Sequence, residues 1–510
     1  MIMWSISFFP NRQEIIVFAI FLFIFYYLVF AIYNLYFSPL AKFPGPKRLA
    51  ISRLPLIRYV ILGTTYKYLD ELHEKYGPVV RMAPDELTTI SPEAWKDVYT
   101  RRPQMTKDPF SMTPPMNGAE SLFTATGDTH VRIRRNFANA FSDKALREQS
   151  KIIEGYIELL LQRLRRETMK SPIGEVDLAK FFGYLSLDIY ADLMFGESFH
   201  GLEGDNEHSW ILGFFLGAKF GSVRNSIQRF HPLEVIFGWL FLRLTAKIRA
   251  QNWKLATDRI TNRLEMGDLG AERSDFVSPL IGNVSESEGG KGITRKELNT
   301  NGLAIVIAGC QLPTVALATS CYFLMRYPRT MRRLAEEVRS YYSEEKNINV
   351  QSTSELPYLE AVINETLRIH HPTPIHLPRN VPPEGAAIAG QWVPGGSVIG
   401  IAMQTAQTSP LNFFEPKVFH PERFLPESHP LYDVRFGRDQ KEAFKPFSAG
   451  PRNCMGGKTF LAQARVTLAR MIWNFEMELL DKDDWNWTDQ RAYLVFEPRA
   501  LHAKLKEREV

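Results

Sequence analysis

A run of 19 residues without a charged side chain, Ile15 to Tyr33, constrains this chain more than any other feature. A helix needs about 20 mainly apolar residues to cross the hydrocarbon core of a bilayer, so the run is long enough to span one. A cleaved signal peptide has a shorter apolar stretch and small residues at its exit, whereas this run leads into the bulky sequence Asn34-Leu35-Tyr36-Phe37. We therefore expect an uncleaved membrane anchor in residues 1–37, with its helix at about 15–33, and a folded domain in residues 38–510. A signal peptide and a buried core helix are the alternatives.

The charges beside the run indicate its orientation. Before the run there is only Arg12, which is offset by Glu14. The cations that follow it are Lys42, Lys47, Arg48, Arg53 and Arg58. Because flanking cations favour the cytoplasmic side of a membrane helix, we expect a single-pass protein with its folded domain in the cytoplasm. The chain also has only three cysteines, an odd and sparse set that makes a poor disulfide framework and fits a reducing compartment.

The rest of the chain has the pattern of one mainly α body with a small β-sheet. Residues from about Ser91 to Arg339 are mostly helical in pattern, and a long apolar helix starts near Thr294, which forms a predicted capping box with Glu297. Short β-branched pieces broken by Pro and Gly predict strands between Pro378 and Ile401, and a helix is predicted from Thr459 to Phe475. The net charge of +5 is small for 510 residues and no basic tract carries interleaved aromatics, so nucleic acid is not an expected partner.

Cys454 stands in a loop suited to binding a metal cofactor, Phe447-Ser448-Ala449-Gly450-Pro451-Arg452-Asn453-Cys454-Met455-Gly456. Its glycines allow tight turns and a close approach of the backbone to a flat ligand. A helix is expected just downstream, so that its first amide groups point at the sulfur and stabilise a thiolate. A thiolate is a good axial ligand for haem iron, and Phe447 could shield it from water. The alternative is a buried free cysteine in a glycine-rich loop.

This loop resembles the haem-binding signature of the cytochrome P-450 family, F-x-x-G-x-R-x-C-x-G. The matching residues are Phe447, Gly450, Arg452, Cys454 and Gly456. The resemblance extends from the hinge sequence KFPGPK to a predicted terminal strand near Leu494, and Asp188 to Phe199 is similar to fungal secondary-metabolite members of the isotrichodermin-hydroxylase kind. It implies the mainly α fold of that family behind the membrane helix, with haem b as the cofactor. It also implies that Cys454 ligates the iron, with Phe447 and Gly456 beside it.

Two further motifs support the resemblance. Glu365 and Arg368 share one face of a predicted helix, and with Arg423 in Pro421-Glu422-Arg423-Phe424 they resemble the family's Glu–Arg–Arg triad, which braces the loop leading to the cysteine. The alternative for the first two is a surface ion pair worth about 0–1 kcal/mol. Residues that resemble the family's cations for the haem propionates are His130, Arg134, Arg379 and Arg452. For His130, an ordinary surface or core histidine is the alternative.

The long central helix departs from the family pattern [AG]-G-x-[DE]-T. The first two positions match, but Gln311 replaces the acid and Leu312 replaces the threonine. Because Leu cannot exchange a proton and Gln is not a useful general acid, we expect protons to come from a substrate hydroxyl or from water held by Gln311, or the reaction to be a rearrangement, dehydration or coupling. Pro313 has no N–H to offer the Gly309 carbonyl and predicts a kink. Thr314 is a candidate for a distal hydroxyl, although it points to a different face.

The resemblance implies an enzyme that activates dioxygen and oxidises a lipophilic small molecule. No flavin or nicotinamide domain fits in the rest of the chain, so electrons are expected from NADPH through a membrane-bound reductase of the endoplasmic reticulum. By analogy with the family, the stretches around the distal pocket are Pro109 to Thr126, Ile305 to Thr314, Thr373 to Leu377 and the neighbourhood of Leu494. Two other classes stay open: a haem-thiolate isomerase or dehydratase that needs no reductase, and a non-catalytic haem protein.

Overall fold

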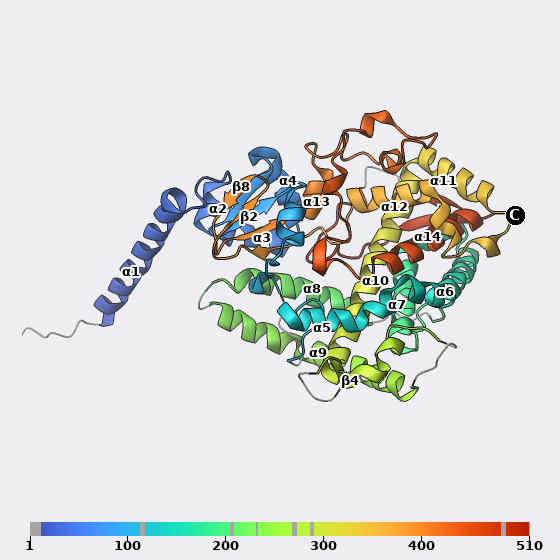
Figure 1. The fold of residues 1–510 in the computed structure, drawn as a ribbon, viewed down its shortest axis with the longest axis horizontal. Helices are drawn as coiled ribbons and strands as arrows, with labels where there is room; N and C mark the ends of the chain where they lie inside the picture. Colours follow the sequence, from blue (N-terminus) through green and yellow to red (C-terminus); the bar gives the residue numbers. More distant parts are fainter. Residues whose placement is uncertain are drawn as a thin grey trace, which may run out of the picture.

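A computed structural model describes residues 12–112, 118–204, 209–230, 233–267, 273–285, 290–480 and 486–508. One long helix stands apart from the body, a small region containing β-strands lies next to it, and a larger helical region makes up the rest (Figure 1). The α-helices are α1 Arg12–Ile32, α2 Lys47–Ile51, α3 Leu54–Leu62, α4 Thr65–Tyr76, α5 Gly127–Ala138, α6 Asp143–Lys170, α7 Leu178–Phe195, α8 Ser209–Ile227, α9 Leu233–Glu265, α10 Arg295–Arg326, α11 Pro328–Tyr341, α12 Pro357–Ile369, α13 Met403–Thr408 and α14 Gly457–Asn474. The fold is therefore mainly α, as predicted.

The amino-terminal helix is longer than the sequence predicted. It begins at Arg12 rather than Ile15, and a π-helical turn, Tyr33–Phe37, continues it. The segment Gln13–Phe37 is long and apolar enough to cross a membrane, and its most apolar window is fully exposed. Arg81 fastens the end of this segment to the body, because its guanidinium donates to the Asn34 carbonyl at 2.7 Å and to Asn34 Oδ1 at 3.1 Å. Among the described residues, the other helix that meets the length and composition criterion is α10, which is mostly buried.

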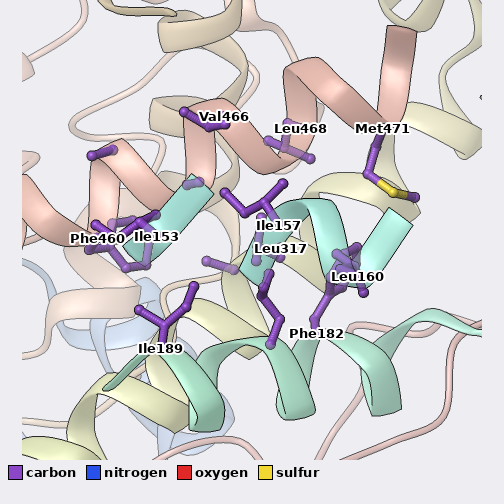
Figure 2. Packing of buried hydrophobic residues seen from close by; sticks show 14 of the residues in the cluster. Ile153, Ile157, Leu160, Phe182, Ile189, Leu317, Phe460, Val466, Leu468 and Met471 are labelled. Carbon is purple, nitrogen blue, oxygen red and sulfur yellow. The ribbon is translucent and has the colours of Figure 1, made fainter. Parts of the chain in front are cut away.

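The largest hydrophobic core lies between α6, α7, α10 and α14. Figure 2 shows the side chains that meet there: Ile153, Ile157 and Leu160 of α6, Phe182 and Ile189 of α7, Leu317 of α10, and Phe460, Val466, Leu468 and Met471 of α14. The predicted capping box fixes the start of α10, since Glu297 N donates to Thr294 Oγ1 at 3.2 Å and Thr294 N donates to Glu297 Oε2 at 2.9 Å. This core holds α10 and α14 in place beside the candidate site.

The main sheet has the strand order β1-β2-β9-β6. Its strands are β1 Val79–Ala83, β2 Glu86–Thr89, β6 Arg379–Asn380 and β9 Val398–Ile401, with β2 and β9 parallel and the other pairs antiparallel. The smaller sheets are the hairpin β7 Ala386–Ile388 with β8 Gln391–Val393, the pair β4 Val284–Ser285 with β5 Ile293–Thr294, and β10 Phe475–Leu479 with β11 His502–Glu507 and β3 Glu175–Asp177. The strands predicted between Pro378 and Ile401 are present.

The carboxyl-terminal region differs from its prediction. Leu494 is not part of a strand but lies in a loop closed by an isolated bridge between Ala492 and Phe496, and the terminal strand is β11 instead. The loop is closed on itself by backbone hydrogen bonds from the Tyr493 amide to the Val495 carbonyl and from the Glu497 amide to the Arg491 carbonyl, so its β-like composition does not produce a strand. Pro313 lies inside α10, which is helical from Arg295 to Arg326, and the kink expected there stays a prediction.

Candidate functional site

The loop before α14 has a tightly fixed backbone around Cys454. A 3-10 turn covers Gly450–Arg452, and the Cys454 amide donates to the Phe447 carbonyl at 2.8 Å. Gly450 has a φ of +76°, and a Cβ there would stand 2.1 Å from the Tyr99 carbonyl oxygen, so only glycine fits. The Phe447 ring meets the Phe460 ring edge to face, with centroids 5.5 Å apart. These contacts fix the position of the sulfur relative to the core.

The Cys454 sulfur is accessible although it is set deep in the protein. Its side chain is exposed, yet burial by the surrounding atoms raises its pKa. A hydrogen bond from the Gly456 amide, the charge of Arg134 and a hydrogen bond from the Gly457 amide oppose that rise. Amide donors and a cation beside the sulfur favour the thiolate form.

α10 presents an aliphatic face made of partly buried residues. Between Thr300 and Ser320 most of its residues are buried, and the partly buried ones are Ala304, Ile307, Ala308, Leu312 and Thr314. Ile307, Ala308 and Leu312 lie three, four and eight residues after Ala304, so these four share one face. Tyr190 of α7 connects α10 with the cysteine loop: a Cβ on Gly309 would lie 2.2 Å from its ring, and burial followed by the charge of Cys454 raises its pKa.

The polar side chains of α10 do not reach this aliphatic face with a free hydroxyl or acid. The Thr314 hydroxyl lies 2.6 Å from the Cys310 carbonyl and 3.2 Å from the Phe182 carbonyl, so it is directed toward α7. Gln311 is buried, and its Nε2 lies 4.0 Å from the Cys310 sulfur. The Thr314 hydroxyl therefore does not point to the face of α10 that carries Leu312. From Ala304 to Leu312 the helix has no hydroxyl and no carboxyl group.

Five basic residues from separate segments gather near the cysteine loop, and we call them the open cluster. They are Lys107, His130 and Arg134 of α5, Arg379 of β6, and Arg452 of the 3-10 turn. An isolated backbone bridge joins Lys107 to Arg379. Arg134 donates to the Asn453 carbonyl at 2.8 Å and to Asn453 Oδ1 at 2.6 Å, which holds it beside Cys454. The four propionate candidates of the sequence are thus in one place, with Lys107 added.

The cations of the open cluster lower one another's pKa. Burial and then the charges of Arg452 and Arg379 lower the pKa of Lys107 to about 7. Burial, Arg452, Lys107 and Arg134 lower the pKa of His130 to about 4. Burial, Arg379 and Arg134 lower the pKa of Arg452 to about 10. Arg452 Nη1 is buried and has no hydrogen-bond partner among the described residues. Among the described residues none of the five side chains is paired with a carboxylate, and a buried N–H such as that of Arg452 Nη1 normally has a partner, so the cluster lacks an anion.

A haem fits this arrangement of residues. Its two propionates carry the negative charge that the open cluster lacks, since Glu120 is the one carboxylate that opposes the lowered pKa of Arg452. The Cys454 sulfur is accessible beside Arg134, and the aliphatic face of α10 is apolar enough to cover a porphyrin. Among the described residues, no group of three or more His, Cys, Asp or Glu side chains could hold a metal ion by itself. A single thiolate donor suits an iron that a porphyrin already holds.

Glu365, Arg368 and Arg423 form a second buried cluster, which also contains Asp439 and which we call the paired cluster. Arg368 donates to the two Glu365 oxygens at 2.7 and 2.8 Å, and Arg423 donates to Glu365 at 3.1 Å and pairs with Asp439. The remaining guanidinium hydrogens reach carbonyls before the cysteine loop, those of Gln407, Pro416 and Phe414. All four charged side chains are at most 1% exposed. The alternative of a surface ion pair is therefore wrong.

Sequence reasoning missed Lys107 and Asp439. Neither belongs to a motif, and each joins its cluster only through the fold: Lys107 through the bridge to Arg379, and Asp439 through its pair with Arg423. A search for charged residues in otherwise apolar or loop-forming stretches near the motifs would have found both as candidates. Part of the predicted distal stretch Pro109 to Thr126, residues 113–117, lies outside the described residues.

Comparison with known proteins gives a consistent result. A model of the Cytochrome P450 family matches residues 44–504. The chain is similar to the cytochrome P450 monooxygenase lcsI of Purpureocillium lilacinum, at 35% identity over 94% of this chain and 92% of that protein. It is 36% identical to averantin hydroxylase of Dothistroma septosporum, over 93% of this chain and 88% of that protein. It is 34% identical to the cytochrome P450 monooxygenase stcF of Emericella nidulans, over 95% and 98% of the two chains.

Proposed function

Because the chain belongs to the cytochrome P450 family of haem-thiolate oxidoreductases, we propose that it is a membrane-anchored monooxygenase that oxidises a lipophilic small molecule in secondary metabolism. The observation that carries this proposal is the open cluster beside an exposed cysteine: among the described residues its basic side chains are paired with no carboxylate, and the buried Nη1 of Arg452, next to Cys454, has no hydrogen-bond partner. No other group in the described residues explains why these charges are held together.

In this proposal each residue of the site has a distinct task. Cys454 ligates the haem iron, and the amides of Gly456 and Gly457 keep its sulfur negative. Phe447 excludes water from the sulfur. The residues that bind the propionates are His130, Arg134, Arg379, Arg452 and, in addition, Lys107. When bound, the haem supplies the reductive activation of dioxygen that the family performs. The paired cluster has the task of bracing the loop that leads to Cys454, since its arginines hold three carbonyls of the preceding segment.

The aliphatic face of α10 favours an unusual proton supply. Leu312 cannot carry a proton, Thr314 is engaged with α7, and Gln311 is buried. Protons then come from a hydroxyl of the substrate or from water held by Gln311. The same observation keeps a second function in view, a rearrangement or dehydration that needs no reductase. Turnover that continues without NADPH and without a reductase would favour this second function.

The electron source and the membrane arrangement are also part of the proposal. The segment Gln13–Phe37 crosses the endoplasmic reticulum membrane once, residues 1–37 are the anchor, and residues 38–510 form the cytoplasmic domain. Electrons reach the haem from NADPH through a membrane-bound reductase. Lys441 and Lys445 precede the cysteine loop in the chain, and we expect the reductase to dock on the side where they lie. Charge reversal at Lys441 should slow reduction most at low ionic strength.

The names of the relatives narrow the expected chemistry but not the substrate. One of them is named a hydroxylase of averantin and the others are named monooxygenases, so hydroxylation is the reaction we test first. The experiment compares the metabolites of a strain that expresses the chain with a strain that expresses the Cys454→Ala variant. An oxidised product that appears only with the unchanged chain, and that disappears when the reductase is removed, is the expected result. Identical metabolites in the two strains would contradict the proposal.

A further inference from the structure

Tyr99 connects three parts of the site that are far apart in the sequence. It lies in the π-helical turn Trp95–Thr100 and is 2% exposed. A Cβ on Gly450 would stand 2.1 Å from the Tyr99 carbonyl oxygen, so the backbone of Tyr99 touches the cysteine loop. Its side chain contacts residues 377 and 379 and the strand β9. One buried residue therefore contacts the cysteine loop, the main sheet and the open cluster.

The Tyr99 hydroxyl is inserted between two paired residues. The antiparallel register of β6 and β9 extends to the residues before β6 and puts Leu377 opposite Ile401. The Leu377 amide donates to the Ile401 carbonyl over a long 3.4 Å, and two residues paired in this way normally exchange a second backbone hydrogen bond. Here the Ile401 amide donates to the Tyr99 hydroxyl at 3.1 Å, and that hydroxyl donates to the Leu377 carbonyl at 2.5 Å. The hydroxyl thus takes the place of the second bond.

The inserted hydroxyl sets the position of residues 373–377, which we call the wall segment because the sequence places them around the distal pocket. A Cβ on Gly400 would stand 2.8 Å from the Leu377 carbonyl carbon, so the wall segment is in close contact with β9 beside the hydroxyl. Without the hydroxyl, the Ile401 amide and the Leu377 carbonyl would both lose a partner. Because unpartnered polar groups inside a protein are unfavourable, the pair would rearrange. The wall segment would then move relative to β9.

The Tyr99 ring supports Arg379, one of the cations assigned to the propionates. The guanidinium carbon of Arg379 lies 4.9 Å from the centroid of this ring. At such a distance a cation is attracted to an aromatic ring. Among the described residues no carboxylate pairs with Arg379, and its guanidinium donates only to the carbonyl of the neighbouring Pro378, at 2.9 Å. The ring is therefore the contact from another segment that fixes the direction of this guanidinium.

The turn that carries Tyr99 is itself held in place. The Trp95 ring is buried and lies 4.9 Å from the Tyr99 ring, measured between centroids. Asp97 Oδ2 accepts a hydrogen bond from the Ala389 amide at 2.9 Å, which ties the turn to the hairpin of β7 and β8. The contact with Gly450 adds a third support. Tyr99 is thus fixed independently of the wall segment and of Arg379, so it can position both.

We propose that Tyr99 is a positioning residue for the reaction and that its two contacts have separate tasks. The hydroxyl sets the place of the wall segment and thereby the shape of the pocket. The ring sets the direction of Arg379 and thereby the strength of haem binding. This inference rests on the proposed function, because the wall segment and Arg379 have these tasks only when haem is bound beside Cys454.

Two variants of Tyr99 separate the two tasks. The full-length haem-loaded protein in bilayer nanodiscs is titrated with imidazole and with the bulky azole clotrimazole, and the shift in haem absorption gives each Kd. Transfer of haem to a scavenging protein is timed separately. Tyr99→Phe keeps the ring, so we expect the Kd of clotrimazole to change roughly threefold or more, while the Kd of imidazole and the transfer rate stay the same. Tyr99→Leu also removes the ring, so haem transfer should become roughly threefold faster or more.

A double-mutant cycle with Arg379→Gln tests whether the ring acts through Arg379. Arg379→Gln alone should speed haem transfer, and adding Tyr99→Leu should speed it no further, because the ring then has no guanidinium to hold. If Tyr99→Leu fails to load haem, Tyr99→Met takes its place, since Met fills more of the space. The control is Tyr342→Phe. Tyr342 is also buried and its hydroxyl donates to Ser352 Oγ at 3.0 Å, away from the site, so all readouts should equal those of the unchanged protein.

Four results would overturn the proposal. An unchanged clotrimazole Kd in Tyr99→Phe would show that the hydroxyl does not set the wall segment. Unchanged haem transfer in Tyr99→Leu, or an acceleration that adds fully to that of Arg379→Gln, would show that the ring does not act through Arg379. An equal change in the Kd of both azoles would indicate general loosening. Failure of the proposed function is distinguishable from these results, because it appears as a missing thiolate spectrum in the unchanged protein before any azole is added.

Discussion

The open cluster and the paired cluster are both rich in arginine, but they differ in how their charges are balanced. In the paired cluster each arginine reaches Glu365, and the free hydrogens of both arginines are taken up by carbonyls and Asp439. In the open cluster the cations lower one another's pKa, and Arg452 Nη1 has no partner among the described residues. The charges of the paired cluster are therefore balanced within the polypeptide, whereas those of the open cluster need an anion from outside it.

The largest effect should follow from breaking the paired cluster. Glu365→Gln removes the charge that two fully buried arginines share. Leaving such charges unpaired costs about 3–5 kcal/mol, so we expect little folded, haem-loaded protein, measured as haem content and free energy of unfolding. The control is Glu360→Gln on the same helix. Its pair with Arg465 is partly exposed, so a loss of no more than about 1 kcal/mol is expected. Equal effects of the two variants would contradict the comparison.

Removing a cation from the open cluster should leave the stability of the haem-free chain unchanged or raise it, in contrast to the loss expected for Glu365→Gln. Arg452→Gln removes a partly buried cation whose buried Nη1 has no hydrogen-bond partner among the described residues, so the haem-free chain should be as stable as before or more stable. Haem should be held less firmly, by roughly 1.5–3 kcal/mol for a lost charged hydrogen bond, that is, a roughly 10-fold to 150-fold faster transfer to a haem-scavenging protein. Arg135→Gln on the exposed side of α5 is the control and should leave the transfer rate unchanged. A destabilised haem-free chain with normal haem retention would show that Arg452 has a structural role instead.

The sequence could predict contacts between residues that are close together in the chain, but not contacts between distant segments. Glu365 and Arg368 are neighbours on one helical face, and Thr294 and Glu297 cap one helix, so local spacing was sufficient to predict both pairs. Lys107 and Asp439 were missed because they enter their clusters from segments that only the tertiary fold brings close. The strands β1 and β2 gave no alternating pattern because all their residues are buried. The direction of the Thr314 hydroxyl likewise depends on the packing of α7.

The pH dependence of haem binding tests whether Lys107 of the open cluster lies beside the haem propionates. The pKa of Lys107 is about 7 in the haem-free chain, against 10.5 for an ordinary lysine. Between these values the unfolded chain binds a proton that the folded chain does not, so the stability of the haem-free protein should rise with pH from about 7 to 10.5. Propionates beside Lys107 would raise its pKa again. Haem binding at about pH 8 should therefore take up protons, measurable by calorimetry in buffers of different ionisation enthalpy. In Lys107→Met we expect a smaller uptake, and an unchanged uptake would exclude Lys107 from the site.

The smallest and most specific effect concerns the aliphatic face of α10. If the native reaction depends on restricted proton supply, the double variant Gln311→Glu with Leu312→Thr should make the native product severalfold more slowly or make a different product. The two single variants are measured beside it, because neighbouring groups in one relay need not act additively. Product distribution and hydrogen peroxide release are the readouts. A double variant that forms the same product at an equal or higher rate with less peroxide would show that Gln311 and Leu312 do not shape the reaction.

The most direct test of the central claim is the absorption spectrum of the reduced protein with carbon monoxide. The unchanged protein should absorb at the position diagnostic of a thiolate ligand, and so should Cys310→Ala and Cys321→Ala, because both of those thiols are buried and their pKa is raised by burial to about 12. Cys454→Ala should lose this signal or fail to incorporate haem, since its sulfur is the accessible one beside the open cluster. A Cys454→Ala protein that keeps the thiolate spectrum would contradict the assignment of the site.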